Sequence, residues 1–217
     1  MYRVFGKRLI DIATSVTLLL LLLPVLLMVA VAVWWRLGRP MLFRQQRRGL
    51  YGEPFTLLKF RTMTDARDAN GDLLPDAARL TPLGQFLRKT SLDELPQLWN
   101  VLRGEMSLAG PRPLLLEYLP YYSDREMTRH NVRPGLTGLA QVNGRNVTTW
   151  DKRLELDVQY VERLSFSLDV KILLATFWQV VRRCDVVAVP GSIQGKLDVL
   201  RARSCNRNDI SVSQESK

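Results

Sequence analysis

Two adjacent carboxylates, Asp93 and Glu94, lie in the stretch RKTSLDELPQLWNVLRGEMSLAGPRP. Cations flank this pair on both sides: Arg88, Lys89, Arg103 and Arg112. Carboxylates surrounded by cations are typical of a site that handles a metal ion together with phosphate groups. A structural interpretation is also open, because Ser91 and Glu94 have the spacing of a capping box, in which two side chains satisfy free amides at a helix start.

Pro96 bears on where this helix begins. A helix capped by Ser91 would contain Pro96 in its interior, where proline removes a backbone hydrogen bond. A helix that starts at Asp93 places Pro96 in its first turn, where proline is tolerated. In both cases the carboxylates lie at the positive end of a helix, which also favours anionic ligands. These residues alone therefore leave helix capping and catalysis both open.

The segment SLDELPQLWNVLRGEMSLAGPRP resembles the signature of the bacterial sugar transferase family, the small monotopic phosphoglycosyl transferases. Other blocks of the chain resemble this family in the same order: KRLIDI near the start, LLKFRTM from Leu57, RPGLTGLAQVNGRN from Arg133, and SLDVKILLATFWQVVRR from Ser167. The resemblance extends to Arg183 and leaves out only the tail. Four ordered blocks are a far more specific signal than one short motif.

This resemblance implies a reaction and the residues that perform it. A sugar-1-phosphate would move from a UDP-sugar to a polyprenol phosphate such as undecaprenyl phosphate, with release of UMP. It would do so at the cytoplasmic face of the bacterial inner membrane, as the first membrane step of glycan assembly. Asp93 would be the nucleophile and form an aspartyl phosphosugar, Glu94 would assist it, and both would place Mg²⁺. The expected phosphate-binding residues are Lys59, Arg61, Arg88, Arg112 and Arg145. The residues expected to bind the lipid phosphate are Lys7 and Arg8.

Composition agrees with anionic partners. The chain has 217 residues, with 31 Lys and Arg against 21 Asp and Glu and a formal charge of +10. Such a charge suits phosphorylated ligands or an acidic membrane surface, and no nucleic-acid-binding motif accompanies it. One histidine and two cysteines exclude a zinc site built from several such residues and do not form a disulfide framework. A non-catalytic, membrane-anchored basic interaction protein is the alternative function, and self-association is a further expectation.

The run from Ile12 to Trp35 carries no charge and is long enough to span a bilayer. Pro24 divides it into halves of about 17 Å, well short of the apolar core. Basic residues flank both ends, and basic flanks prefer the cytoplasmic side. We therefore expect a re-entrant helix hairpin in one leaflet. A single straight span and a signal peptide cleaved after Ala32 are the alternatives.

The rest of the chain predicts a small, helix-rich α+β catalytic domain. Residues 1–36 are expected to form the membrane segment, 37–200 the catalytic domain and 201–217 a polar, disordered tail. Lys59 and Arg61, two apart on a strand, should face the same side. The single histidine, His130, is expected at the surface. The predicted strands are Met41–Gln45 and Phe55–Thr62, and the main predicted helices are Leu83–Lys89, Asp93–Arg103, Trp150–Leu164 and Leu168–Arg183.

Overall fold

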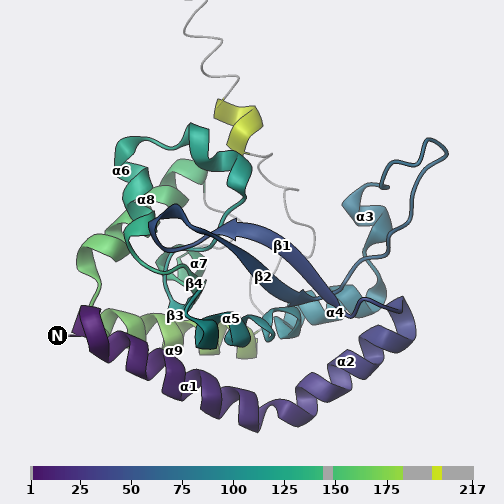
Figure 1. Ribbon diagram of the computed structural model, residues 1–217, viewed down its shortest axis with the longest axis horizontal. Helices are drawn as coiled ribbons and strands as arrows, with labels where there is room; N and C mark the ends of the chain where they lie inside the picture. The colour runs from purple at the N-terminus through teal and green to yellow at the C-terminus, as the bar shows by residue number, and fades with distance from the viewer. Residues whose placement is uncertain (1, 144–148, 183–196, 202–217) are drawn as a thin grey trace, which may run out of the picture.

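The computed structural model describes residues 2–143, 149–182 and 197–201. Helices dominate, and two small two-stranded sheets lie among them, so the predicted helix-rich α+β class is confirmed. Figure 1 shows a long bent pair of helices along one edge of the molecule, with the β-hairpin and the remaining helices above it.

The bent pair consists of α1 (Lys7–Leu21) and α2 (Leu23–Leu37), preceded by the π-helical turn η1 (Tyr2–Gly6). The helices are bent by 64° at Leu22. Pro24 lies in the first turn of α2, where its missing N–H removes no helical hydrogen bond, so the proline starts a second helix. Within the described residues, no helix alone is long and apolar enough to cross a membrane, although α1 and α2 together reach that length and composition.

Helix α1 turns a polar stripe inward. Lys7, Asp11 and Ser15, four residues apart, are its buried residues, while Leu9 and Leu20 are about 70% exposed. Asp11 accepts hydrogen bonds from Ser107 Oγ at 2.7 Å and from the Leu108 amide at 3.2 Å. This polarity is inverted relative to a helix of a soluble domain, whose apolar face is the buried one.

The two strands predicted after the apolar run are confirmed, and they form a β-hairpin. Strands β1 (Leu42–Arg48) and β2 (Pro54–Phe60) pair antiparallel from Leu42↔Phe60 to Arg48↔Pro54. The short helical turn η2 (Leu50–Gly52) joins them. The strand β2 packs Phe55 and Leu57 into a core cluster with Leu98, Val101, Met106 and Leu108, and Phe60 into a second cluster with Val29, Val33 and Leu87.

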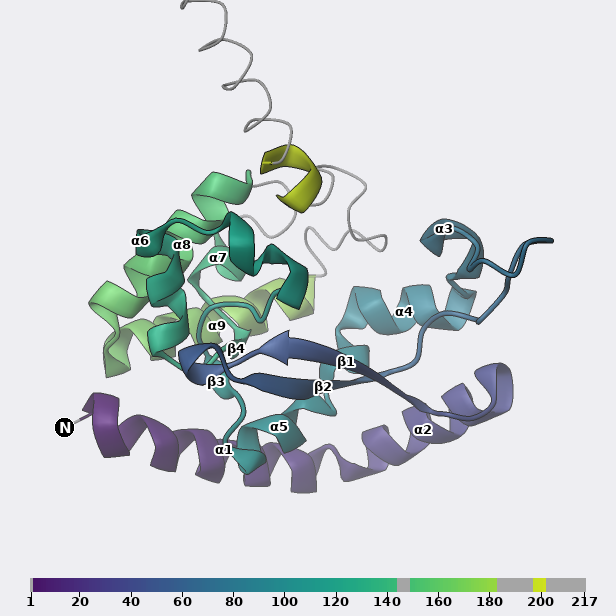
Figure 2. The same cartoon turned by 45° about the horizontal axis from the view of Figure 1, so that its top comes forward.

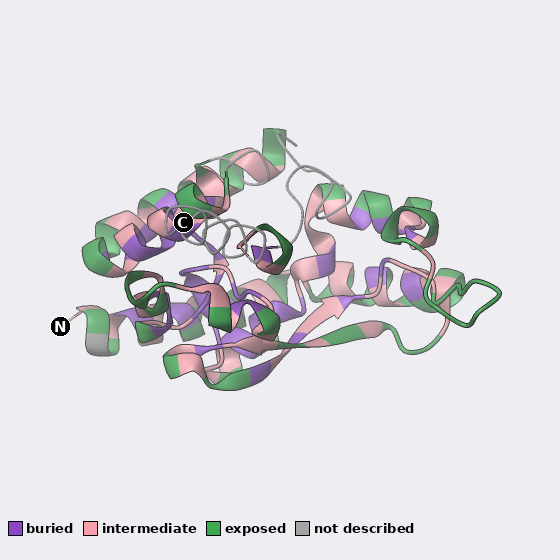
Figure 3. Cartoon of the chain, turned by 90° about the horizontal axis from the view of Figure 1, so that it is seen from above, coloured by how far each residue is buried: buried purple, intermediate pink, exposed green. Residues whose placement is uncertain are grey.

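A polar loop after β2 leads through α3 (Asp76–Arg79) to α4 (Pro82–Thr90), and this loop projects from the body in Figure 2 and is largely exposed in Figure 3. Thr81 caps α4 by accepting from the Gly84 amide. A Cβ atom at Gly84 would lie 1.9 Å from the Thr62 carbonyl oxygen, so only glycine allows this close contact between α4 and the end of β2. The turn η3 (Leu92–Glu94) and α5 (Gln97–Arg103) follow.

The second sheet was not predicted. Strands β3 (Ser107–Ala109) and β4 (Gly135–Thr137) pair in parallel, and a Cβ at Gly135 would lie 2.1 Å from the Gly110 amide nitrogen. Three-residue strands are too short to show a period in the sequence. The remaining elements are η4 (Leu116–Tyr121), α6 (Asp124–Met127), η5 (Thr128–Asn131), α7 (Leu139–Val142), α8 (Trp150–Arg163) and α9 (Phe166–Arg182).

Two expectations about single residues are wrong. His130 is buried, not exposed, because η5 packs it beside Tyr122, with the two rings 5.9 Å apart. Burial and the neighbouring Arg129 lower the pKa of His130 to about 4. Arg201, placed in the disordered tail, instead is helical together with residues 197–200 and is bound to the folded body.

Candidate active site

The two carboxylates lie in a short 3-10 turn between two helices. Helix α4 ends at Ser91, whose left-handed backbone (φ 57°) reverses the chain into η3. Ser91 makes no side-chain capping bond, so the capping-box interpretation is wrong at this position. The capping box in this chain belongs to Ser123 and Glu126. Pro96 then precedes α5, as a helix start at this point requires.

Glu94 is held by two cations. Lys59 Nζ, from β2, donates to Glu94 Oε1 at 2.6 Å, and Arg112 Nη2 donates to the same oxygen at 2.8 Å. Burial alone would raise the pKa of Glu94, but Arg112 and Lys59 outweigh it and hold this pKa well below its usual value. Glu94 is therefore ionised at any physiological pH, and its position is fixed.

The environment of Asp93 has the opposite effect on its pKa. Asp93 is only 7% exposed, and its side chain makes no hydrogen bond or ion pair within the described part of the chain. Burial, followed by repulsion from Glu94, raises the pKa of Asp93 from 3.8 to about 6, against the attraction of Lys59, Arg88 and Arg112. Asp93 is thus a poorly solvated carboxylate whose oxygens are not engaged, which is the state expected of a carboxylate nucleophile.

The structure brings three of the five predicted phosphate-binding residues to this pair. Lys59 and Arg112 contact Glu94, and Arg88, near the end of α4, donates from Nε to Thr62 Oγ1 at 3.1 Å. Burial lowers the pKa of Arg88, and Asp93 is the foremost of the charges that oppose this shift. Arg145 lies outside the described residues.

Arg61 is engaged elsewhere. Its guanidinium donates to the carbonyl oxygens of Leu37 and Met63 at 3.2 and 3.1 Å and pairs with Asp65 at 2.5 Å. Strand β2 ends at Phe60, so the alternation that would place Lys59 and Arg61 on one side ends between them. Arg61 ties the end of α2 to the exit of the hairpin.

Lys7 and Arg8, expected to meet a lipid phosphate, both bind the body of the domain. Lys7 is buried, and its Nζ lies 2.6 Å from Asp169 of α9. Arg8 donates to the carbonyl oxygens of Val101 and Leu102 at 2.6 and 2.9 Å, at the C-terminal end of α5. A cation at the C-terminal end of a helix is favoured by the helix dipole. These contacts fasten α1 under the domain.

A buried ion pair missed in the sequence supports the site. Arg129 Nη2 lies 2.7 Å from Asp157 Oδ2 of α8, and both side chains are at most 2% exposed. The same nitrogen donates to the Arg112 carbonyl oxygen at 2.7 Å and so fixes the backbone of a residue that contacts Glu94. Asp157 stands on the apolar face of α8 next to Val158, and an acid on a buried face was the available signal.

Arg47 is a further missed cation near the site. It donates to the Pro113 carbonyl oxygen at 3.4 Å, and burial together with the nearby Arg112 lowers the pKa of Arg47 to about 10. In the sequence, Arg47 is one of the basic residues that flank the apolar run, and these residues indicate membrane topology. Arg47 thus adds positive charge near Arg112, which contacts Glu94.

The donor set fits a magnesium ion that is shared with a ligand. Among the described residues, no group of three or more His, Cys, Asp and Glu side chains could hold a metal ion. Mg²⁺ commonly takes only one or two carboxylates and completes its shell with water and substrate phosphates. Asp93 offers uncommitted carboxylate oxygens, while Glu94 gives one oxygen to Lys59 and Arg112. Such a site would form only together with a phosphorylated ligand.

Comparisons with known proteins identify the family of this chain. The model of the family described as "Bacterial sugar transferase" matches residues 2–183. The chain is 50% identical over 205 residues to the uncharacterized sugar transferase EpsL of Bacillus subtilis, covering 94% of this chain and 98% of that protein. It is 43% identical over 185 residues to the UDP-glucose:undecaprenyl-phosphate glucose-1-phosphate transferase of Klebsiella pneumoniae, covering 80% of this chain.

The named enzymes are longer than the region they share with this chain. The match spans 39% of the Klebsiella pneumoniae protein and 67% of a Caulobacter vibrioides protein with the same name. The shared region includes the turn with both carboxylates, since the family model spans residues 2–183. A match over most of the chain to the family model, and high identity to relatives, establish that this chain belongs to the bacterial sugar transferase family.

Proposed function

We propose that this protein transfers a sugar-1-phosphate from a UDP-sugar to a polyprenol phosphate, through a covalent intermediate on Asp93. The observation that carries this proposal is the difference in contacts and pKa between two adjacent carboxylates. Glu94 is fixed by Lys59 and Arg112, while Asp93 is buried, makes no hydrogen bond within the described residues, and has a raised pKa. A site that only started a helix would have no need of this arrangement.

The related proteins support the class of substrates. One relative, from Klebsiella pneumoniae, is named as a UDP-glucose:undecaprenyl-phosphate glucose-1-phosphate transferase, and another, from Salmonella typhimurium, as an undecaprenyl-phosphate galactose phosphotransferase. The two names share the acceptor and differ in the sugar. We therefore assign the acceptor class, a polyprenol phosphate, and leave the identity of the sugar to a panel of UDP-sugars.

In the first step, a carboxylate oxygen of Asp93 attacks the β-phosphorus of the UDP-sugar. The bond from this phosphorus to the bridging oxygen breaks, UMP leaves with the bonding electrons, and a phosphosugar remains on Asp93. In the second step, the acceptor phosphate attacks this phosphorus and releases the carboxylate. Lys59, Arg88 and Arg112 stabilise the phosphate oxygens, because arginine and lysine donate charge-assisted hydrogen bonds to them. Bound Mg²⁺, held by Asp93 and Glu94, would neutralise pyrophosphate charge.

The bent helix pair supports a location in one leaflet of the inner membrane, with the domain facing the cytoplasm. Large apolar side chains are exposed along α1 and α2 and along α9, which lies beside α1 in Figures 1 and 2. Exposed apolar surface on this scale is typical of membrane or protein contact. The exposed apolar side chains on α1 and α2 include Leu9, Leu20, Leu21, Leu27, Met28, Val31, Trp34 and Trp35. Those on α9 are Phe166, Leu174, Phe177, Trp178 and Val181.

The decisive experiment separates the two steps. Purified protein is mixed with Mg²⁺ and a UDP-sugar without acceptor, and UMP is measured after rapid acid quenching. We expect one equivalent of UMP per active enzyme and the mass of one sugar phosphate on the peptide that contains Asp93. With its correct sugar donor, an enzyme that releases UMP only when acceptor is present, and never carries the adduct, would refute the covalent mechanism. A protein that releases no UMP from any donor, even with acceptor, would support the non-catalytic alternative.

A further inference from the structure

A short helix at residues 197–201 packs onto the domain beyond the end of the family model at residue 183. We name it the C-terminal helix; it appears in yellow in Figure 1. Leu197 is 1% exposed and belongs to a core cluster with Leu114, Tyr118 and Leu154. The match to the Bacillus subtilis relative covers 94% of the chain, so it extends past Arg201 and includes this helix.

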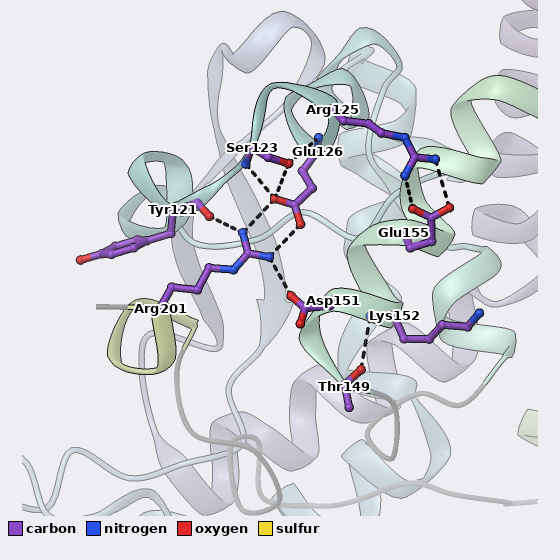
Figure 4. A network of polar contacts seen from close by, with 9 residues as sticks. All are labelled: Tyr121, Ser123, Arg125, Glu126, Thr149, Asp151, Lys152, Glu155 and Arg201. Atoms are coloured by element: carbon purple, nitrogen blue, oxygen red, sulfur yellow. Dashed lines mark hydrogen bonds and ion pairs between the residues drawn. The ribbon is translucent and has the colours of Figure 1, made fainter. Parts of the chain in front are cut away.

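Arg201 anchors the C-terminal helix to three elements, η4, α6 and α8 (Figure 4). Its two terminal nitrogens each donate to one carboxylate oxygen of Glu126 at 2.8 Å, a bidentate pair. It also donates to Asp151 at 2.8 Å, at the start of α8, and to the Tyr121 carbonyl oxygen. These hydrogen bonds from Arg201 are the foremost reason that the pKa of Glu126 falls to about 2, so the pair persists at any physiological pH.

Glu126 is a well-fixed partner. It also accepts from the amide and hydroxyl of Ser123 at 2.8 and 2.9 Å, as the capping box of α6. Its side chain is 15% exposed, against 84% for Asp151. Because solvent weakens an exposed ion pair, Glu126 carries most of the anchoring and Asp151 little.

The core cluster that contains Leu197 adjoins the chain segment of an active-site residue. Leu114 is two residues from Arg112, which contacts Glu94. Arg129 holds the Arg112 carbonyl oxygen on one side of this segment, and farther along it Leu114 belongs to the buried cluster that Leu197 completes. The segment that carries Arg112 is therefore held both by the buried Arg129 and by the C-terminal helix.

We propose that Arg201 is a positioning residue, which holds Leu197 in the core cluster that contains Leu114 and thereby keeps Arg112 in place for the donor phosphates. The inference rests on the proposed function, because it assigns Arg112 to the pyrophosphate of the UDP-sugar. The C-terminal helix is then part of the catalytic domain, and the boundary of the functional chain lies after Arg201 and not at the end of the family model.

The test compares two truncations and two arginine variants in the full-length membrane-bound enzyme. Deleting residues 202–217 should leave kcat and KM within twofold, whereas deleting 197–217 should lower kcat/KM for the UDP-sugar at least tenfold. Arg201→Gln should lower it about fivefold or more. Arg125→Gln is the matched control, because Arg125 also joins α6 to α8, through Glu155, without touching the C-terminal helix; it should stay within twofold.

Rates are divided by the UMP burst amplitude, which counts active molecules, so a simple loss of folded protein would leave kcat and KM unchanged. The KM for the lipid acceptor should not move in Arg201→Gln. Glu126→Gln should reproduce the loss, and the double variant should be no worse than either single one, since the two side chains act as one contact. If Arg201→Gln keeps the wild-type kcat/KM per active molecule, the positioning role is wrong. If wild-type protein releases no UMP, the proposed function itself has failed.

Discussion

The two neighbouring carboxylates should respond to neutralisation in opposite directions. Asp93→Asn removes a buried charge that the fold disfavours, while Glu94→Gln removes a charge that two cations stabilise. We expect Asp93→Asn to raise the thermal stability at pH 8 and Glu94→Gln to lower it. Helix capping predicts something else, a cost of up to about 1–2 kcal/mol for removing a capping side chain.

The magnitude follows from the pKa of Asp93. A rise from 3.8 to about 6 corresponds to about 3 kcal/mol of destabilisation once the group is ionised, at about 1.4 kcal/mol per pKa unit. The folded state holds the proton more tightly, so this penalty is absent below pH 4, grows as pH rises from 4 to 6, and is complete above it. Asparagine keeps a polar group in the same place, so we expect a gain of about 1–3 kcal/mol at pH 8.

Glu94 has the opposite sign. Its folded pKa lies below its ordinary value of 4.5, so its stabilisation is present above pH 4.5 and is lost only as the solution becomes strongly acidic. Glu94→Gln leaves Lys59 and Arg112 without their carboxylate, at a cost of about 2 kcal/mol or more.

The assay is thermal unfolding in detergent, followed by intrinsic fluorescence, at pH 5 and pH 8. For a chain of this size, 1 kcal/mol corresponds to roughly 2–4 °C in Tm. Asp93→Asn should unfold about 5 °C above wild type at pH 8, with the difference shrinking at pH 5, and it should release no UMP. A Tm below wild type at pH 8, with no dependence of the difference on pH, would show that Asp93 is not held in a buried, repulsive environment.

Three further outcomes are expected. The rate of the UMP burst should rise with pH through about 6, because the proposed mechanism requires an ionised Asp93; a rate independent of pH between 5 and 8 would contradict this. Arg129→Met should lower kcat/KM for the donor at least tenfold, because it frees the Arg112 backbone and leaves the buried Asp157 without its ion-pair partner. Arg163→Met, on the exposed end of α8, should not lower kcat/KM. Tags on both ends should be accessible only from the cytoplasm, and Pro24→Ala should shift part of the population to one straight span with its N-terminus outside.

Local patterns in the chain determined the elements and the identity of the candidate catalytic pair. The residue pattern predicted the two strands of the β1–β2 hairpin and the helix α8, and Pro24 predicted the break between α1 and α2. These features depend on neighbours in the sequence, so the sequence suffices for them. The family blocks likewise mark Asp93 and Glu94, because a motif of contiguous residues is legible in the sequence itself.

Only the tertiary structure decided what surrounds each charge. Lys59 and Arg61 stand two apart in sequence, yet Lys59 contacts Glu94 and Arg61 contacts Leu37, because β2 ends between them. Burial and long-range pairing set the opposite pKa shifts of Asp93 and Glu94, which no local pattern encodes. Contacts between residues far apart in the chain depend on how whole elements pack, and for that reason Arg129 with Asp157, and Arg201 with Glu126, emerged only from the fold.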